Sequence, residues 1–332
     1  MPLIAHSTLP SFARLAREGV DVRPPAAWDG PVLRVGLVNT MADGALAATE
    51  RQFLRLLAAA TPAAGVELHA CGLPEIPRGD EARRHCDAHY LTLEALRGVR
   101  PHAVIVCGAN VPDPDLARLY YREALVEVIE WVEASVPLAM FSCLATHAVL
   151  HYRHGKPRRA LPDKRWGVFA HRVVAPEHPL CAGLPARLAA PHSRWNDVPA
   201  ADFAAAGLQV LVVDDDGGVH LAATPDGRRV FMQGHPEYDP VSLLKEHKRE
   251  VLRFAAGARA DCPAPPHACL DAAGERRLAM HAAAVAQAVR TGAAAPPYPE
   301  DELVPHLADT WRAPTERLFA AWLARLEDEA GA

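Results

Sequence analysis

Short apolar segments alternate with helical patterns through the first half of this chain, and that alternation limits the possible folds more than any other feature. Four aliphatic and β-branched segments are typical of strands buried on both faces: 32–39, 66–70, 103–107 and 136–142. Helical patterns separate them: around 53–57, near 88–98, and from about Leu116 to Glu133. Strands joined through helices form a parallel sheet. The sequence therefore predicts an α/β fold with a doubly wound, mostly parallel sheet and helices on both faces.

The second half of the chain has a looser pattern. Short strand-like segments with Gly and Pro between them predict antiparallel strands and long loops: 167–174, 208–213, 218–223 and 229–233. Later patterns predict helices at 240–256, 271–291 and 314–328. We expect an N-terminal arm (1–31), one main domain (32–256) and a helical C-terminal extension (257–332) that packs on the same domain.

Composition and charge argue against several classes of protein. The chain has 332 residues and is 50% hydrophobic, which is enough for a large buried core. Its 35 Lys and Arg and 40 Asp and Glu are interspersed, so we expect no nucleic-acid partner. No apolar segment reaches the roughly 18 residues of a membrane span, and the start lacks the pattern of a signal peptide. We therefore expect a cytoplasmic protein that does not bind membranes. Seven cysteines without a CxxC pair favour neither disulfides nor a zinc site.

Cys143 ends the apolar segment 137–142 and opens a helix-like segment, 144–150. A thiol at this junction lies at the carboxyl end of a parallel strand and near the positive end of a helix, where the thiolate is favoured. Backbone N–H groups of the same turn, including that of Leu144, can receive an oxyanion. A buried structural cysteine is the alternative.

The second candidate cluster is 233–239, which follows the apolar strand 229–232. His235 and Glu237 are two residues apart, so both side chains lie on the same side of an extended segment. Glu237 could orient His235, as the third member of a nucleophile, base and acid arrangement does. With 17 histidines in the chain, His235 alone could equally be a surface residue.

Other residues are weaker candidates. Arg249 on the helix after this cluster could clamp a carboxylate, and the segment 108–110 could supply N–H donors at the same sheet edge as Cys143. The polar segment 191–195 looks like a compact loop. His147, His151 and His154 have helical spacing, but without neighbouring carboxylates we expect no metal there.

These features together resemble the homoserine O-succinyltransferase and O-acetyltransferase family, which has a class I glutamine-amidotransferase-like, flavodoxin-like fold. The resemblance extends over about 34–256 and 295–325. The segments that carry it are 49–57, 108–109, 142–143, 161–169, 190–194, 234–240, 249–250, 310–312 and 318–323.

The resemblance implies a nucleophile at Cys143, a general base at His235 and an orienting acid at Glu237. It also implies that Lys164, Ser193 and Arg249 help to hold an amino-acid substrate, and that the protein is a homodimer. The oxyanion and acyl pocket would involve Leu144, Gly108, Ala109 and Pro112. Such enzymes bind no resident cofactor and use acyl-CoA as a co-substrate.

The chain departs from the family pattern in three places. Leu144 and Ala145 replace the usual Trp-Gly after the nucleophile, and the segment 39–46 is longer and lacks a lysine. Pro112 stands where acetyl users tend to have Glu and succinyl users Gly. Because Pro112 carries no charge to repel a distal carboxylate, we favour succinyl over acetyl. Residues 257–294 look like an insertion of unassigned role.

With this resemblance, the residues predict ping-pong acyl transfer through a Cys143 thioester, and the resemblance implies acyl-CoA as donor, the hydroxyl of L-homoserine as acceptor and a role in methionine biosynthesis. L-Serine is an alternative acceptor, because one methylene changes binding by only about 1–3 kcal/mol. A glutaminase or hydrolase that uses the same three residues is another alternative. Ser142 and Leu144 disfavour it, since amidotransferases normally have glycines on both sides of the nucleophile.

Overall fold

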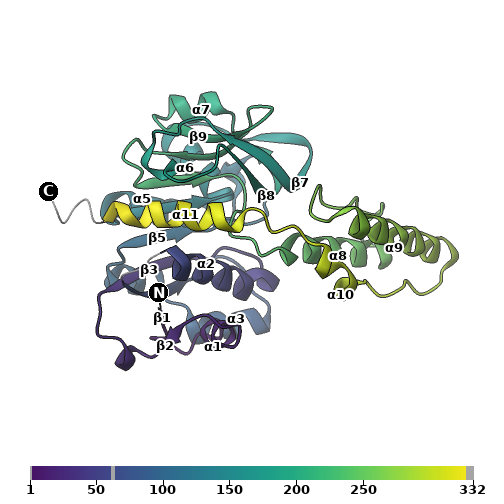
Figure 1. Cartoon of the computed structure of the whole chain (residues 1–332), viewed down its shortest axis with the longest axis horizontal. Helices are drawn as coiled ribbons and strands as arrows, with labels where there is room; N and C mark the ends of the chain where they lie inside the picture. Colours follow the sequence, from purple (N-terminus) through teal and green to yellow (C-terminus); the bar gives the residue numbers. More distant parts are fainter. Residues whose placement is uncertain (1, 61–63, 327–332) are drawn as a thin grey trace.

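An 11-stranded sheet forms the centre of the computed structural model, which describes residues 2–60 and 64–326 (Figure 1). The strands from β2 to β11 are parallel, in the order β2-β1-β4-β3-β5-β6-β11, and β10, β9, β7 and β8 continue the sheet with antiparallel pairing. This confirms the predicted fold class. The strands are β1 (Leu3–Ile4), β2 (Val22–Arg23), β3 (Val32–Val38), β4 (Gly65–Cys71), β5 (Ala103–Val106), β6 (Leu138–Ser142), β7 (Arg159–Val173), β8 (Arg187–Asp197), β9 (Gln209–Asp214), β10 (Val219–Ala223) and β11 (Arg229–Met232).

Helices cover both faces of the sheet. One face packs against α1 (Pro10–Arg17), α2 (Leu46–Ala60) and α11 (Arg312–Leu323). The other packs against α4 (Leu93–Val99), α5 (Arg122–Ser135), α6 (Leu144–His154) and α7 (Ala200–Ala205). The remaining helices are α3 (Asp80–His89), α8 (Val241–Ala255), α9 (Ala272–Thr291) and α10 (Glu300–Leu303). In Figure 1, α8, α9 and α10 project from one side of the sheet domain.

Two predicted helices have different bounds in the structure. The pattern near 88–98 corresponds to α3 and α4, because Tyr90 is extended and Thr92 caps α4 by accepting a hydrogen bond from Ala95 N. The helix predicted from Leu116 begins only at Arg122, since the chain makes a short 3-10 turn and Leu119 is extended. Apolar spacing continues through both breaks, so periodicity alone did not reveal them.

The segment 191–195, predicted as a loop, lies inside strand β8, so that prediction was wrong. Pro191 pairs with Val168 of β7, and β8 is the outermost strand of the sheet. Proline is tolerated on an edge strand, where a missing N–H breaks no ladder on the outer side.

The N-terminal segment predicted as an arm adds two short strands to the other edge of the sheet. Leu3 pairs with Val66 of β4 and with Val22 of β2. Helix α1 packs against α2 through Phe12 and Leu15, which are buried in the same core. Residues 2–31 therefore extend the sheet and cover part of one face.

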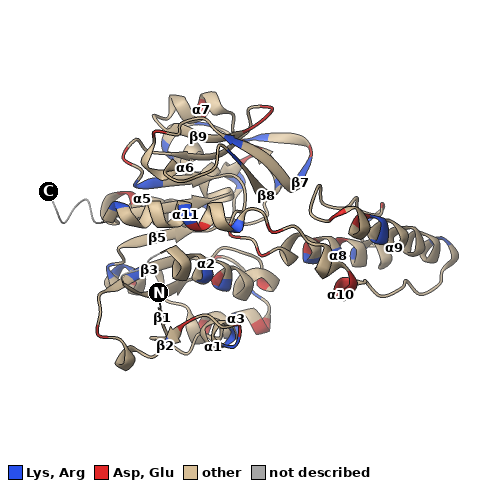
Figure 2. Ribbon diagram, in the orientation of Figure 1, with Lys and Arg blue, Asp and Glu red and all other residues tan. Residues whose placement is uncertain are grey.

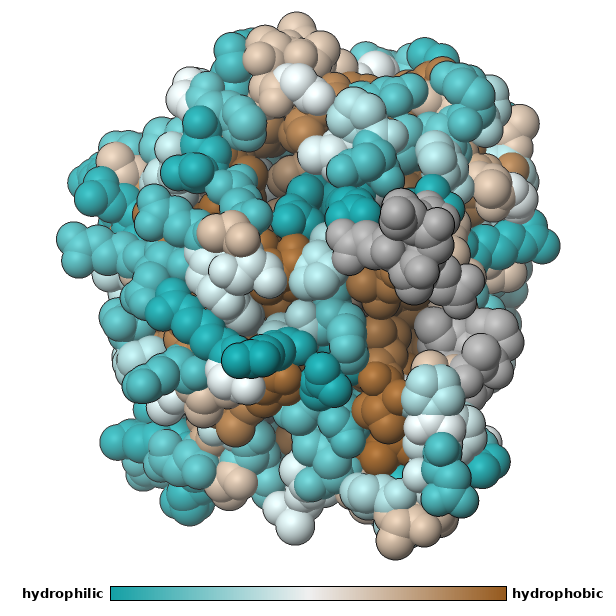
Figure 3. Space-filling view, turned by 90° about the vertical axis from the view of Figure 1, so that its left-hand side faces the viewer, coloured by the Kyte–Doolittle hydropathy of each residue, from teal (hydrophilic) through white to brown (hydrophobic). Residues whose placement is uncertain are grey.

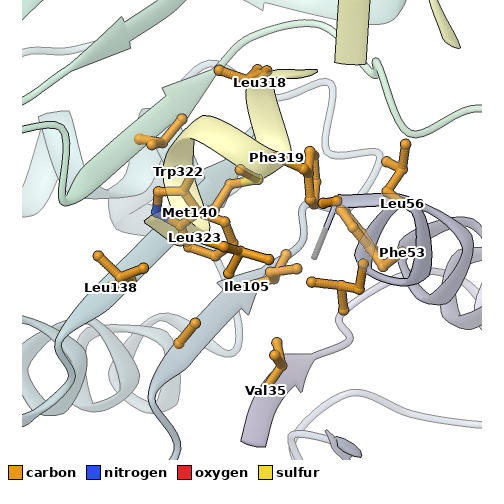
Figure 4. Packing of buried hydrophobic residues seen from close by; sticks show 14 of the residues in the cluster. Val35, Phe53, Leu56, Ile105, Leu138, Met140, Leu318, Phe319, Trp322 and Leu323 are labelled. Atoms are coloured by element: carbon orange, nitrogen blue, oxygen red, sulfur yellow. The ribbon is translucent and has the colours of Figure 1, made fainter. Parts of the chain in front are cut away.

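Helix α11 closes the hydrophobic core on one face of the sheet (Figure 4). Trp322 and Phe319 point toward Met140 and Ile105 of the sheet and toward Phe53 of α2. The side chain of Trp322 is completely buried. The C-terminal helix α11 thus contributes large buried side chains to the hydrophobic core between the sheet and α2.

We expect Trp322→Ala to lower the free energy of unfolding by about 3–5 kcal/mol, because it removes a buried indole and leaves a cavity. Urea unfolding followed by circular dichroism measures this change. Tyr120→Ala is the matched control, since the Tyr120 ring is 65% exposed and its removal should cost less than about 1 kcal/mol. Equal losses in the two variants would contradict the packing role of α11.

The surface carries mixed charges. Lys and Arg alternate with Asp and Glu over most elements, except for an acidic cluster on α10 (Figure 2). On the face drawn in Figure 3, hydrophobic residues are visible mainly in narrow strips between hydrophilic ones. None of the described helices is both long and apolar enough to span a bilayer.

Candidate active site

Cys143 occupies a sharp turn between β6 and α6. Its backbone has φ 51° and ψ −110°, a conformation that costs energy for any residue with a Cβ. Cys143 N donates to Met232 O of the neighbouring strand β11 at 2.7 Å, and Thr146 Oγ1 donates to the same oxygen at 3.0 Å. These bonds hold the turn in place, so the thiol is presented at the strand end as in a nucleophile elbow.

His235 and Glu237 follow β11, which lies beside β6 with Met232 opposite Ser142. Because the two strands are parallel, their carboxyl ends lie at the same edge and bring Cys143 and His235 together. The thiol and the imidazole lie close enough for each to shift the pKa of the other, and His235 Nδ1 lies 2.8 Å from Glu237 Oε1. His235 N also donates to Pro191 O at 2.7 Å, and the ring of Tyr238 stacks on the imidazole at 4.6 Å. The structure therefore brings all three predicted residues into one chain of contacts.

The charges around Cys143 and His235 favour the ionised forms of both side chains. Burial would raise the pKa of the Cys143 thiol, but the charge and hydrogen bond of His235 and the charge of Arg194 outweigh it, and the pKa is lowered. Burial would lower the pKa of His235, but Glu237 and Cys143 raise it well above its usual value. Both shifts favour the thiolate and imidazolium form of the pair over the neutral form.

The other six cysteines all lie in described residues and have raised pKa values. Burial raises the pKa of Cys107 and of Cys71 to about 12. The same cause raises the pKa of the remaining thiols: Cys86, Cys181, Cys262 and Cys269. Cys143 alone among the seven has the environment of a reactive thiol.

The predicted oxyanion segment approaches the turn of the nucleophile closely. A Cβ on Gly108 would lie 2.6 Å from Leu144 N and 2.8 Å from Ser142 O, so only glycine fits there. Leu144 is the first residue of α6, where backbone N–H groups have no helical partner. Ala109 packs against the hydrophobic core that includes Leu144, and Pro112 O accepts a hydrogen bond from Asn196 Nδ2 at 3.0 Å. The amide of Leu144 and the 108–112 loop are therefore adjacent.

Glu246 of α8 joins two of the three residues that the resemblance assigned to the amino acid. Lys164 Nζ lies 3.2 Å from Glu246 Oε2, and Ser193 Oγ donates to the same oxygen at 2.6 Å. Tyr238 OH donates to Glu246 Oε1 at 2.9 Å, which connects this cluster to the ring stacked on His235. Burial would raise the pKa of Glu246, but Lys164 and the two hydroxyl donors lower it. Glu246 is thus a largely buried carboxylate, with its side chain 15% exposed, that Tyr238 connects to His235.

Arg249 lies one turn further along α8, but its side chain is 59% exposed and bonded to Glu250. Among the described residues it makes no hydrogen bond with Lys164 or Ser193. Sequence reasoning missed Glu246, although its i, i+3 spacing from Arg249 places both on one helix face.

The C-terminal motif 310–312 holds the loop that carries the base. Trp311 Nε1 donates to Tyr238 O at 2.9 Å, and Arg312 Nη2 donates to Asp239 Oδ1 at 2.9 Å. Arg55 of α2 binds the same carboxylate at 2.8 Å. Three segments far apart in the sequence therefore meet around residues 235–239.

Two groups of three potential metal ligands converge within the described residues: His171, His192 and His220, and His6, Glu67 and His69. In the buried group, Arg194 Nε donates to His192 Nδ1, and His192 Nε2 lies 3.1 Å from His171 Nε2. Burial lowers the pKa of all three imidazoles, and the charges of Arg194 and Arg165 lower those of His192 and His220 further. The same arginines oppose a cation there. The histidines with helical spacing on α6 lie in different surroundings: His147 is buried against Gln233, and His154 is exposed.

The model of the family described as "Homoserine O-succinyltransferase" matches residues 2–329 of this chain. The chain belongs to the homoserine O-succinyltransferase family. It is 46% identical over 327 residues to a protein of Allochromatium vinosum named homoserine O-succinyltransferase, covering 97% of this chain and 92% of that one. A Methylococcus capsulatus protein of the same name is 43% identical, with 98% and 93% covered. Membership confirms the resemblance and makes the chain an acyltransferase.

A solved structure shares the fold of this family member. The chain resembles a glutamine amidotransferase from Methylobacillus flagellatus with a TM-score of 0.50 and 13% identity, covering 89% of this chain and 95% of that one. At that identity the likeness supports the predicted amidotransferase-like fold and nothing about activity.

Proposed function

We propose that this protein transfers a succinyl group from succinyl-CoA to the hydroxyl of L-homoserine, by a ping-pong reaction through a thioester on Cys143. The names of its relatives support the donor and the acceptor. The observation that carries the mechanism is the chain of contacts from Cys143 through His235 to Glu237 at the ends of two parallel strands.

In the first half-reaction, the Cys143 thiolate attacks the thioester carbonyl of the donor. The N–H of Leu144 and the amides of the 108–110 loop stabilise the developing oxyanion. The C–S bond to CoA breaks, and the imidazolium of His235 gives its proton to the departing thiolate. One thioester replaces another, so the step is nearly balanced in energy.

In the second half-reaction, neutral His235 removes the proton from the acceptor hydroxyl, whose oxygen attacks the acyl-enzyme. The C–S bond to Cys143 breaks, which restores the thiolate and leaves the proton on His235. Glu237 keeps the imidazole in the required tautomer and stabilises its charged form.

The cluster around Glu246 suits the amino-acid end of the acceptor. A carboxylate such as Glu246 can bind an α-ammonium group, and Lys164 and Arg249 can bind an α-carboxylate. Ser193 supplies a hydroxyl beside them. Rotation of the exposed Arg249 side chain would bring its guanidinium to the same cluster.

Acyl loading tests this proposal directly. Purified protein is mixed with succinyl-CoA or acetyl-CoA, and intact mass spectrometry and release of free CoA are followed with L-homoserine, with L-serine or with no acceptor. We expect a succinyl adduct on Cys143 that homoserine discharges. An adduct that serine discharges faster would reassign the acceptor. Repeated turnover without either acceptor, with CoA released in excess over the enzyme, would indicate a hydrolase and overturn the proposal.

A further inference from the structure

Arg158 is a buried arginine whose hydrogen bonds all go to backbone carbonyls. It lies between α6 and β7 and is 5% exposed. Its Nη2 donates to Val111 O at 2.8 Å and to Asp113 O, and its Nε donates to Pro114 O at 3.4 Å. These three carbonyls belong to the loop that continues from Gly108 and Ala109.

Arg158 makes no ion pair with any acidic side chain of the described residues. Two other arginines do have one: the buried Arg194 pairs with Asp197 at 2.5 Å, and the half-buried Arg165 pairs with Asp214 at 2.7 Å. The carboxylate of Asp113 pairs instead with Arg118, at 3.5 Å. Because a buried charge without a partner is costly, this cation is a site where an anion would be stabilised.

The loop that Arg158 holds also lies against the turn of the reacting thiol, since a Cβ on Gly108 would lie 2.6 Å from Leu144 N. The charge of Cys143 is the strongest favourable influence on the pKa of Arg158, which burial lowers. The charge of Arg158 in turn helps to lower the pKa of His147, one helical turn from Cys143. Arg158 is therefore linked to the turn of the nucleophile through the 108–114 loop.

Two unpartnered polar atoms lie close to this guanidinium. Asn196 shares Val111 O with Arg158, and its Oδ1 is buried without a hydrogen bond. His147 donates from Nε2 to Gln233 Oε1, because that oxygen is an acceptor, and its Nδ1 is also buried and unpartnered. Buried polar atoms are normally hydrogen-bonded, and both of these atoms are acceptors, so a water or another donor, not a carboxylate, would satisfy them.

We propose that Arg158 binds the distal carboxylate of the acyl group and so makes the enzyme selective for a dicarboxylic donor. This inference rests on the proposed function, because it assigns a residue to the donor of that reaction. Two methylenes separate the thioester carbonyl from the distal carboxylate of a succinyl group. A carbonyl held at the Leu144 amide therefore leaves the carboxylate within the region bordered by the 111–114 loop. Arginine can bind it in bidentate fashion while the loop carbonyls keep the guanidinium oriented.

The test compares single-turnover loading of Cys143 by succinyl-CoA and by acetyl-CoA, measured by intact mass. In Arg158→Gln we expect the ratio of the two second-order rate constants, succinyl over acetyl, to fall about 30-fold or more, as for loss of one partner of a desolvated charge pair. The matched control is Arg159→Gln, since Arg159 is the next residue and its side chain is 68% exposed. The control should leave the ratio unchanged.

A role in positioning the loop alone would slow both donors equally, and an unchanged ratio in Arg158→Gln would overturn the inference. If that variant does not fold, the unmodified protein still decides the matter. Butyryl-CoA has the length of succinyl-CoA without the distal carboxylate, and we expect it to load about 30-fold more slowly. Equal loading would overturn the inference. Failure of the unmodified protein to load any donor would instead count against the proposed function.

Discussion

Cys143→Ala should reduce the rate of O-acylhomoserine formation by about 10⁴-fold or more, because the whole reaction passes through this sulfur. Alanine keeps the Cβ and tolerates the turn no worse than cysteine does, so the fold should be retained. The measurement is free CoA release together with intact mass after incubation with succinyl-CoA.

Cys86→Ala is the control for this experiment. Cys86 lies on α3, is partly exposed and has a raised pKa. Its removal should leave both the rate and the acyl adduct unchanged. Near wild-type turnover in Cys143→Ala would rule out the thioester route.

His235→Asn should lower the rate constant for acyl loading by about 10³-fold, because it removes both the proton donor and the counter-charge of the thiolate. It should also change how the thiol titrates. In the wild type the Cys143 pKa is below its ordinary value, so alkylation by iodoacetamide should reach its plateau at a pH below that value. Without the imidazolium, burial dominates and raises the pKa, so the midpoint of alkylation should move to higher pH.

His154→Asn is the control for this second variant, since His154 lies exposed at the end of α6. Its alkylation profile should match that of the wild type. An unshifted midpoint in His235→Asn would mean that His235 does not set the charge of Cys143.

The triad was predictable because each member follows a buried strand closely. Parallel strands place their carboxyl ends at one edge of the sheet, so Cys143 after β6 and His235 after β11 meet once these strands are neighbours. The order of strands was not predictable from the sequence. The pairing of β6 with β11 skips four strands and depends on packing between segments far apart in the chain.

The residues that sequence reasoning missed act through contacts that have no local pattern. Glu246 is one of several charged residues on α8, and only the fold shows that it faces Lys164 and Ser193. Arg158 stands in a basic segment, 156–159, that looks like ordinary solvated surface. Its burial follows from the approach of the 111–114 loop, which is a long-range contact. Strand β8 was missed because Pro191 and its polar neighbours resemble a turn.

The parallel pairing of β6 with β11 determines when Cys143 becomes reactive during synthesis and folding. The nucleophile is synthesised long before the strand and loop that activate it. Until β11 pairs with β6, Cys143 lacks the neighbouring imidazolium of His235. Its thiol then has ordinary reactivity toward oxidants and alkylating agents, like that of other cysteines. Reactivity therefore arises with assembly of the native sheet and disappears when that sheet comes apart.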